Sequence, residues 1–309
     1  MTETIEESLK NGFISWRNNL EIGVPYLLST IITAILTVVS VIVVALIAAA
    51  SSALTRDMDS QMAPIVVLAA LCASSLAALA LISASNAYFS AGAIGMSLEA
   101  AMKGRTTLSD MAYYGRNRWF DIFKMNMLCI ALLAIPGVIL LLPPVYAFYT
   151  GAIPQGMALT FIATAVYLTY AVFVCFMYTV TGTAIIADGV GLLQGMKSAY
   201  GFSCKNRIKI LFTLFTYMGT LSLASYAWAV LTSPLGLLQF LSPGVYNIAQ
   251  GLLMLVFLLI ASFMVTPLYT IWLMRIYRGK GTKGAKTLHS PVSRHQTREQ
   301  HGTQRDIYV

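Results

Sequence analysis

Six stretches of this sequence are each long and apolar enough to cross a lipid bilayer. A hydrocarbon core of roughly 30 Å needs about 20 apolar residues in a helix. The stretches cover residues 22–50, 63–92, 122–149, 157–187, 208–233 and 247–274. Only 10% of the 309 residues are charged, whereas soluble domains average about 25%. The sequence therefore predicts an all-α integral membrane protein and excludes a soluble enzyme.

The basic residues are divided unequally between the two sides of the predicted bundle. Of the 20 Lys and Arg residues, 19 fall in segments on one side, and Arg56 is alone on the other. Loops rich in Lys and Arg stay on the cytoplasmic side of a membrane. We therefore expect a multi-pass protein of the cell membrane with both termini in the cytoplasm.

A related run of residues leads into the first, third and fifth spans. The runs cover residues 17–22, 116–122 and 205–210; each starts with a basic residue followed by Asn and ends on Ile. This similarity predicts three pseudo-repeated hairpins, each preceded by a cytoplasmic interfacial amphipathic helix. The alternative is that any loop at a cytoplasmic boundary collects Arg, Lys and Asn.

The segment before the first run has the period of an amphipathic helix. Its apolar residues recur every three or four positions, at Ile5, Leu9, Phe13, Trp16 and Leu20, and such a helix lies flat in the headgroup layer. Thr4 with Glu7, and Thr107 with Asp110, have the spacing of a capping box. Asp188 is a candidate N-cap for the third interfacial helix.

The predicted transmembrane domain covers residues 1–277, and residues 278–309 form a disordered, basic cytoplasmic tail. Basic residues beside the spans and in this tail are candidates for contact with anionic lipid headgroups of the inner leaflet. They are Arg17, Arg116, Arg118, Lys205, Arg207, Arg278, Lys280, Lys283 and Lys286. We expect the lipid bilayer as the main partner, with a membrane protein partner or a homo-oligomer as further options, and no nucleic acid.

The predicted spans contain no ionisable residue near their centres, where such residues usually mark function. We therefore expect no enzyme activity, no cofactor and no metal site; Asp110, Asp121 and Asp188 would be the only catalytic candidates on the cytoplasmic loops. A few polar residues lie in or near spans: Asn86, Asn126, Gln250, Thr164, Thr169, Thr179, Thr181 and Thr183. They either hydrogen-bond between helices or line a path for an uncharged solute.

Loose patterns in the sequence resemble a known family. Asn18 with Pro25, the segment 92–104 that ends in Ala-Ala-Met-Lys-Gly, and the segments 188–198 and 205–206 are similar to uncharacterised six-helix membrane proteins of archaea. That family is in turn distantly similar to the membrane domain of some bacterial glycerophosphodiester phosphodiesterases. The resemblance implies no phosphodiesterase activity here, because the catalytic barrel needs roughly 200 residues or more.

Two functions follow from these observations. The first is a non-enzymatic protein that organises lipid or a partner through its cytoplasmic helices and basic tail. The alternative is a transporter or permease subunit for a neutral or lipidic solute, because Glu99-Ala100-Ala101 is similar to the cytoplasmic coupling loop of binding-protein-dependent importers.

Overall fold

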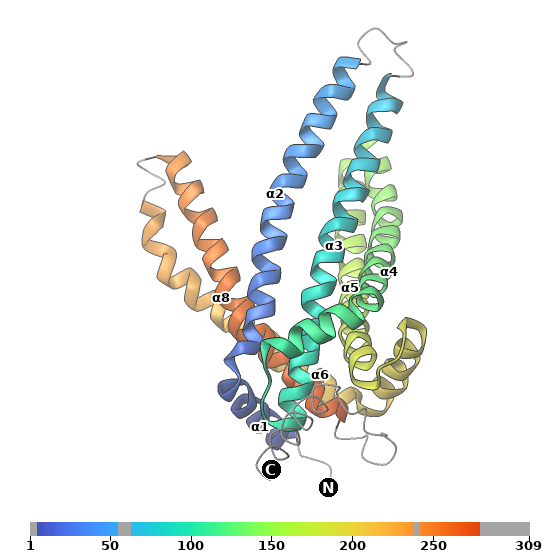
Figure 1. Cartoon of the computed structure of the whole chain (residues 1–309). Coiled ribbons are helices and arrows are strands. Elements are labelled where there is room, and N and C mark those ends of the chain that lie inside the picture. The colour runs from blue at the N-terminus through green and yellow to red at the C-terminus, as the bar shows by residue number, and fades with distance from the viewer. Residues whose placement is uncertain (1–4, 55–62, 238–241, 279–309) are drawn as a thin grey trace, which may run out of the picture.

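The computed structural model describes residues 5–54, 63–237 and 242–278, and within these ranges its regular structure is entirely helical. A short helix, α1, precedes three hairpins of long helices (Figure 1). The helices are α1 (Ile5–Asn18), α2 (Gly23–Leu54), α3 (Ala63–Lys103), α4 (Leu108–Tyr149), α5 (Ile153–Asp188), α6 (Leu192–Thr232) and α8 (Pro243–Arg278), with the 3-10 turns η1 (Leu20–Ile22) and η2 (Ser233–Leu237).

Six of the helices, α2 to α6 and α8, are long and apolar enough to cross a membrane. This confirms the prediction of six apolar helices, as in a multi-pass membrane protein. The predicted starts of the first two spans, at residues 22 and 63, lie within one residue of the starts of α2 and α3.

The segments between hairpins differ from the prediction. The stretch 93–103, expected as a cytoplasmic loop, continues α3 to Lys103, where Gly104 ends the helix with a φ of 76°. The two later interfacial segments are not separate helices but the first turns of α4 and α6. No residue near Asn117 breaks α4, whereas α6 bends at Asn206, whose φ of −127° and ψ of 24° are not helical.

The three hairpins pack together in a closed ring. Each first helix contacts its own second helix and the second helix of another hairpin: α2 lies against α3 and α8, α4 against α5 and α3, and α6 against α8 and α5. The second helices α3, α5 and α8 also contact one another. This makes them an inner layer, which α2, α4 and α6 surround.

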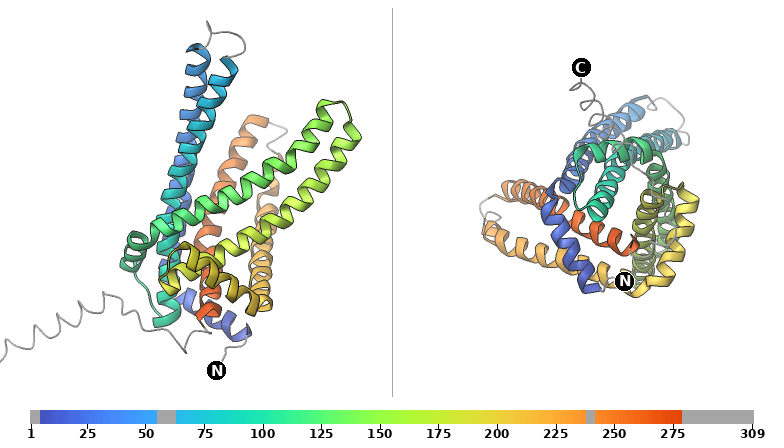
Figure 2. Two further views of the ribbon diagram at one scale, coloured as in Figure 1. Left: turned by 90° about the vertical axis from the view of Figure 1, so that its right-hand side faces the viewer. Right: turned by 60° about the horizontal axis from the view of Figure 1, so that its bottom comes forward.

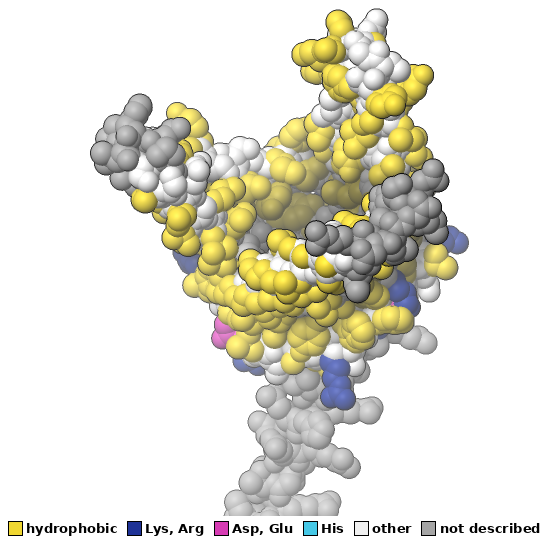
Figure 3. Space-filling model, turned by 90° about the horizontal axis from the view of Figure 1, so that it is seen from above, with side chains coloured by type: hydrophobic (Ala, Val, Ile, Leu, Met, Phe, Trp, Pro, Cys, Tyr) yellow, Lys and Arg dark blue, Asp and Glu magenta, His cyan; other side chains and the backbone are white. Residues whose placement is uncertain are grey.

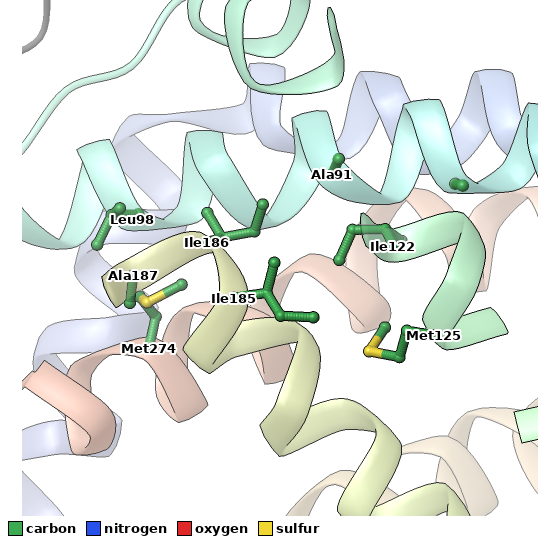
Figure 4. Packing of buried hydrophobic residues seen from close by; sticks show 9 residues of the cluster. Ala91, Leu98, Ile122, Met125, Ile185, Ile186, Ala187 and Met274 are labelled. Atoms are coloured by element: carbon green, nitrogen blue, oxygen red, sulfur yellow. The ribbon is translucent and has the colours of Figure 1, made fainter. Parts of the chain in front are cut away.

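Most of the buried core lies at one end of the molecule, which we call the base and define as residues 5–30, 83–126, 174–213 and 262–278. One core cluster brings together side chains of α3, α4, α5 and α8, among them Ile122, Ile185 and Met274 (Figure 4). A second cluster surrounds Ile210, and a third surrounds Ile22. Ile22, Ile122 and Ile210 are all fully buried.

Beyond the base, the hairpins diverge as three arms, which we define as residues 31–54, 63–82, 127–173, 214–237 and 242–261. Figures 1 and 2 show the arms leaning away from one another. Seen from the arm ends, the surface is hydrophobic and hollowed between the arms (Figure 3). The base therefore holds the fold together, and the arms offer apolar side chains to their surroundings.

The prolines inside α4 do not end that helix. Pro136 lies inside α4 and leaves the carbonyl of Leu132, four residues earlier, without its usual N–H partner. The hydroxyl of Tyr170 on α5 donates a hydrogen bond to that carbonyl at 2.9 Å. A neighbouring helix thus satisfies the backbone group that the proline frees, as a bilayer environment requires.

Candidate lipid-headgroup surface

All charged side chains that the structure describes lie in the base, and none of the described residues of the arms is charged. Figure 3 accordingly shows Lys and Arg only at the periphery, below the hydrophobic arms. The basic residues that the sequence singles out are distributed over three places around the base, one beside the first helix of each hairpin. We call each place a patch and describe them in chain order.

The first patch is the outer side of α1 and of the start of η1, which follows it. Arg17 is exposed there, and so are Phe13 and Leu20 at 47% each. The opposite side of α1 packs on α8 (Figure 2, right), where the indole N–H of Trp272 donates to the carbonyl of Leu9 at 3.0 Å. The helix therefore has one protein-facing side and one exposed side that is both apolar and basic.

The protein-facing side of α1 consists mainly of small residues. Ser8 and Gly12 are buried, and a Cβ added to Gly12 would lie 2.3 Å from the indole of Trp272. The predicted apolar stripe is therefore divided between two environments. Leu9 and Trp16 pack against the core cluster of Ile22, whereas Phe13 and Leu20 point outward.

Asn19 joins the first patch to the connection between α3 and α4. Its side-chain amide donates to the carbonyl of Ser15 at 2.8 Å and to that of Gly104 at 3.0 Å. Its side-chain oxygen accepts from the backbone N–H of Thr106 at 3.0 Å. This buried side chain fixes the angle at which α1 meets the base.

The second patch lies on the first turns of α4. Arg116 is exposed and Arg118 half-buried, beside the exposed rings of Trp119 and Phe120. The ammonium of Lys124 lies 4.3 Å from the centre of the Phe120 ring, a cation–π geometry. Aromatic and basic side chains thus share one surface.

The capping predictions have different outcomes. At the start of α4, a carboxylate oxygen of Asp110 accepts from the backbone N–H of Thr107 at 2.9 Å, which confirms that capping box. Asp188 is not an N-cap: it is the last residue of α5, Gly189 follows it with a φ of 67°, and α6 begins only after Gly191. Thr4 lies outside the described residues.

The third patch surrounds the bend of α6. Lys205 and Arg207 flank Asn206, and both are exposed. The amide of Asn206 donates to the carbonyl of Phe202, four residues earlier, at 3.0 Å. Asn19 makes the same bond to its own i−4 carbonyl at the break between α1 and η1.

The end of α8 is turned inward rather than outward. Arg278 is half-buried, and its guanidinium donates to the carbonyl of Ala187 at the end of α5, at 3.3 Å. A cation at a helix C-terminus also stabilises the helix dipole. The hydroxyl of Tyr277 donates to Asp188 at 2.5 Å. Lys280, Lys283 and Lys286 lie outside the described residues.

Glu99 is a buried charge that the sequence does not reveal. It lies inside α3 with 5% of its surface exposed, so the segment 99–101 that is similar to a coupling loop is helical here, and its Glu is buried in the protein. One carboxylate oxygen accepts from the hydroxyl of Tyr114 at 2.8 Å, and the other lies 2.7 Å from the ammonium of Lys103. The i,i+4 spacing of Glu99 and Lys103 was the available signal.

The asparagines near the spans link neighbouring helices. The amide of Asn126 on α4 donates to the carbonyl of Ser83 at 3.2 Å, and its oxygen accepts from Tyr178 at 2.7 Å. Asn86 accepts a hydrogen bond from Ser29 on α2. By contrast, Thr169, Thr179 and Thr183 donate to carbonyls four residues earlier in α5 itself.

Within the described ranges, no three His, Cys, Asp or Glu side chains gather where they could hold one metal ion. Comparison with models of protein families, with curated proteins and with solved structures found no significant match to this chain. The resemblance to archaeal membrane proteins therefore stays a prediction.

Proposed function

We propose that this protein is a non-enzymatic organiser of the cell membrane that gathers anionic lipid headgroups around its base. In this proposal the base faces the cytoplasm, and both termini lie on that side. The observation that carries it is the pairing of exposed basic and exposed large apolar side chains in all three patches; in the third patch the apolar side chain is Ile208, 73% exposed beside Arg207. A headgroup layer satisfies both kinds of side chain, because it is apolar at its inner boundary and negatively charged at its surface.

The proposal includes three repeated units, each an interfacial segment followed by a hairpin. In two of the three basic runs the helix is interrupted at an Asn, namely Asn19 and Asn206. The side-chain amide of each donates to the carbonyl four residues earlier. All three runs end on an Ile that is fully buried. In the proposal, the three units carry the patches on three sides of the base, so that lipids are gathered around the whole molecule.

The expected strength of the effect follows from the number of basic residues. Each Lys or Arg near an anionic surface contributes about 1 kcal/mol. Lys124 pairs with Asp121 at 3.3 Å. The other exposed or half-exposed basic residues of the patches are five: Arg17, Arg116, Arg118, Lys205 and Arg207. Together they are sufficient to enrich anionic lipid around the base, and salt should weaken this enrichment.

Lipid composition around the protein tests this proposal. The full-length protein is reconstituted in phosphatidylcholine vesicles that contain a minority of phosphatidylglycerol, and is then extracted in polymer-bounded discs. We expect the discs that hold wild-type protein to contain a larger anionic fraction than empty discs. Changing all five residues to Gln should remove this enrichment.

The matched control exchanges Arg for Lys and Lys for Arg at the same five positions, which keeps the charge. It should retain the wild-type enrichment. The proposal is wrong if wild-type discs match empty ones, or if the Gln variant gathers as much phosphatidylglycerol as the wild type.

A further inference from the structure

The bottom of the hollow between the three arms differs in chemistry from its walls. The walls belong to the arms, whose surface is hydrophobic (Figure 3) and whose described residues carry no charge. The bottom lies where the three hairpins meet, at the top of the base. Each hairpin contributes a tyrosine near the limit between base and arm: Tyr26 on α2, Tyr178 on α5 and Tyr217 on α6. We call these three side chains, together with Ser83 on α3, the floor.

The three tyrosines converge on one space inside the ring of helices. Tyr178 and Tyr217 both lie close enough to Tyr26 to interact with it electrostatically, although they come from the other two hairpins. None of these three rings is stacked on another; that of Tyr217 packs on Tyr269 of α8, with the ring centres 4.6 Å apart. Tyr26 is surrounded by protein, yet all three side chains of the floor tyrosines are only half-buried. Their accessible surface therefore faces the space that they enclose.

The tyrosines of the floor offer a free hydrogen-bond donor and oxygens that can still accept. The hydroxyl of Tyr178 donates to Asn126 at 2.7 Å, and the hydroxyls of Tyr26 and Thr270 are 2.5 Å apart. Both phenol oxygens keep a lone pair for a further hydrogen bond. The hydroxyl of Tyr217 makes no hydrogen bond to another residue within the described ranges, so it is free to donate.

Ser83 adds a buried hydroxyl to the floor. Only 5% of its surface is exposed, and its hydroxyl has no hydrogen-bond partner in the part of the chain that the structure describes. Ser83 lies one helical turn from Ala87, which belongs to the central core cluster, so its side chain faces the inside of the bundle. Its carbonyl accepts from Asn126, which also accepts from Tyr178. Because a buried hydroxyl without a partner is unfavourable, Ser83 points to a ligand at this level.

We propose that the floor binds the hydroxyl group of an uncharged lipid, whose hydrocarbon chains fill the hollow above it. Tyr217 donates to the oxygen of this hydroxyl, and the oxygen of Tyr26 or Tyr178 accepts its hydrogen. A phosphate or an ammonium group does not suit the floor, because none of its four residues is charged and a buried charge needs a partner.

The hydrophobic walls favour a lipid over a water-soluble molecule. The arms lean apart (Figures 1 and 2), so the hollow is open to the bilayer, and a lipid reaches the floor without crossing water. This site is separate from the three patches, which lie around the outside of the base. A hydroxyl-bearing lipid thus satisfies both the polar floor and the apolar walls.

Photocrosslinking of the full-length protein tests this proposal. The probe is a diacylglycerol with a diazirine in one acyl chain, added to the protein in phosphatidylcholine vesicles. The control probe is a phosphatidylcholine that carries the same diazirine chain. Light attaches each probe to the residues beside it, and mass spectrometry identifies the labelled peptides. We expect the diacylglycerol probe to label peptides next to the floor more strongly than the control probe, and excess dioleoylglycerol to suppress this labelling.

Two tyrosines of α6 provide a matched pair of variants. Y217F removes the free donor and should make dioleoylglycerol a roughly three- to tenfold weaker competitor, the effect of losing one hydrogen bond. Tyr226 lies on the opposite side of α6, since nine residues turn a helix by about 900°, and it is 71% exposed. Y226F should therefore behave as wild type. S83A removes a hydroxyl that has no protein partner among the described residues, and replaces Y217F should that variant fail to fold.

Two results would overturn the proposal. In the first, dioleoylglycerol competes equally well in the floor variant, in Y226F and in wild type, so that the polar floor does not hold the lipid. In the second, the phosphatidylcholine probe labels the same peptides as strongly as the diacylglycerol probe, and ordinary lipid chains fill the hollow.

Discussion

The start of α2 provides the sharpest test of how the base is packed. Gly23 meets α8 so closely that an added Cβ would lie 2.5 Å from the backbone oxygen of Phe263, and 2.6 Å and 2.8 Å from two atoms of its ring. The ring can rotate, but the oxygen belongs to the helix backbone. This carbonyl lies four residues before Pro267, which is inside α8 and cannot donate to it. Gly23 therefore lets α2 cover a carbonyl that has lost its helical partner.

The variant Gly23→Ala should destabilise the protein. Carbon and oxygen in close contact are about 3.3–3.6 Å apart, so α2 would have to move by nearly 1 Å. Overpacking of this kind costs about 1–3 kcal/mol. The higher helix propensity of Ala offsets less than about 1 kcal/mol, because Gly23 is at the first position of the helix. We expect a net loss of about 1–2 kcal/mol.

Gly219 in α6 is the matched control, because nothing lies within 4 Å of the position where its Cβ would be. Gly219→Ala should stabilise the protein by up to about 1 kcal/mol through helix propensity alone. Both variants are heated in the same detergent, and size-exclusion chromatography measures the folded fraction that remains at each temperature. The shift in unfolding temperature relative to wild type is then compared between the two variants. If Gly23→Ala proved as stable as Gly219→Ala, the close approach of α2 to α8 would be wrong.

Two further substitutions test single hydrogen bonds. Tyr170→Phe leaves the carbonyl of Leu132 without the donor that replaces the N–H missing at Pro136, and should cost about 1–3 kcal/mol in the same unfolding assay; unchanged stability would refute this role. Asn19→Ala removes three hydrogen bonds and should cost about 2 kcal/mol or more, whereas Asn18→Ala, at an exposed position, should cost far less. Equal effects of the two asparagine variants would contradict the assignment of Asn19 as the joint between α1 and the base.

Hydropathy was sufficient to predict the six apolar helices, because a helix in hydrocarbon must be apolar over its whole length. The similar runs before alternate spans also identified core positions, since the Ile residues that end them, Ile22, Ile122 and Ile210, are all fully buried. Asn206 coincides with the bend in α6. These features depend on local sequence, so a single chain is enough to find them.

Hydropathy could not predict which side of each helix is buried in the protein and which side is exposed. Lipid tails are as apolar as a protein core, so hydropathy does not distinguish Ile122, which is buried, from Val41, which is exposed. The burial of Glu99 depends on Tyr114, which comes from the next helix. The side of α1 that meets α8 includes the small residues Ser8 and Gly12 and only part of the apolar stripe, namely Leu9 and Trp16. Such pairings arise from the tertiary fold.

The orientation of the base in the membrane is the central claim of this account. Cys204 is exposed in the base, and Thr150 is exposed in the turn between α4 and α5, at the far end of an arm. A membrane-impermeant maleimide is applied to intact cells expressing a protein in which the other three cysteines, Cys72, Cys129 and Cys175, are replaced by Ala. We predict that Cys204 reacts only after the membrane is opened, and that Thr150→Cys in a protein also lacking Cys204 reacts from outside. The reverse pattern of labelling would place the basic patches outside the cell and contradict the account.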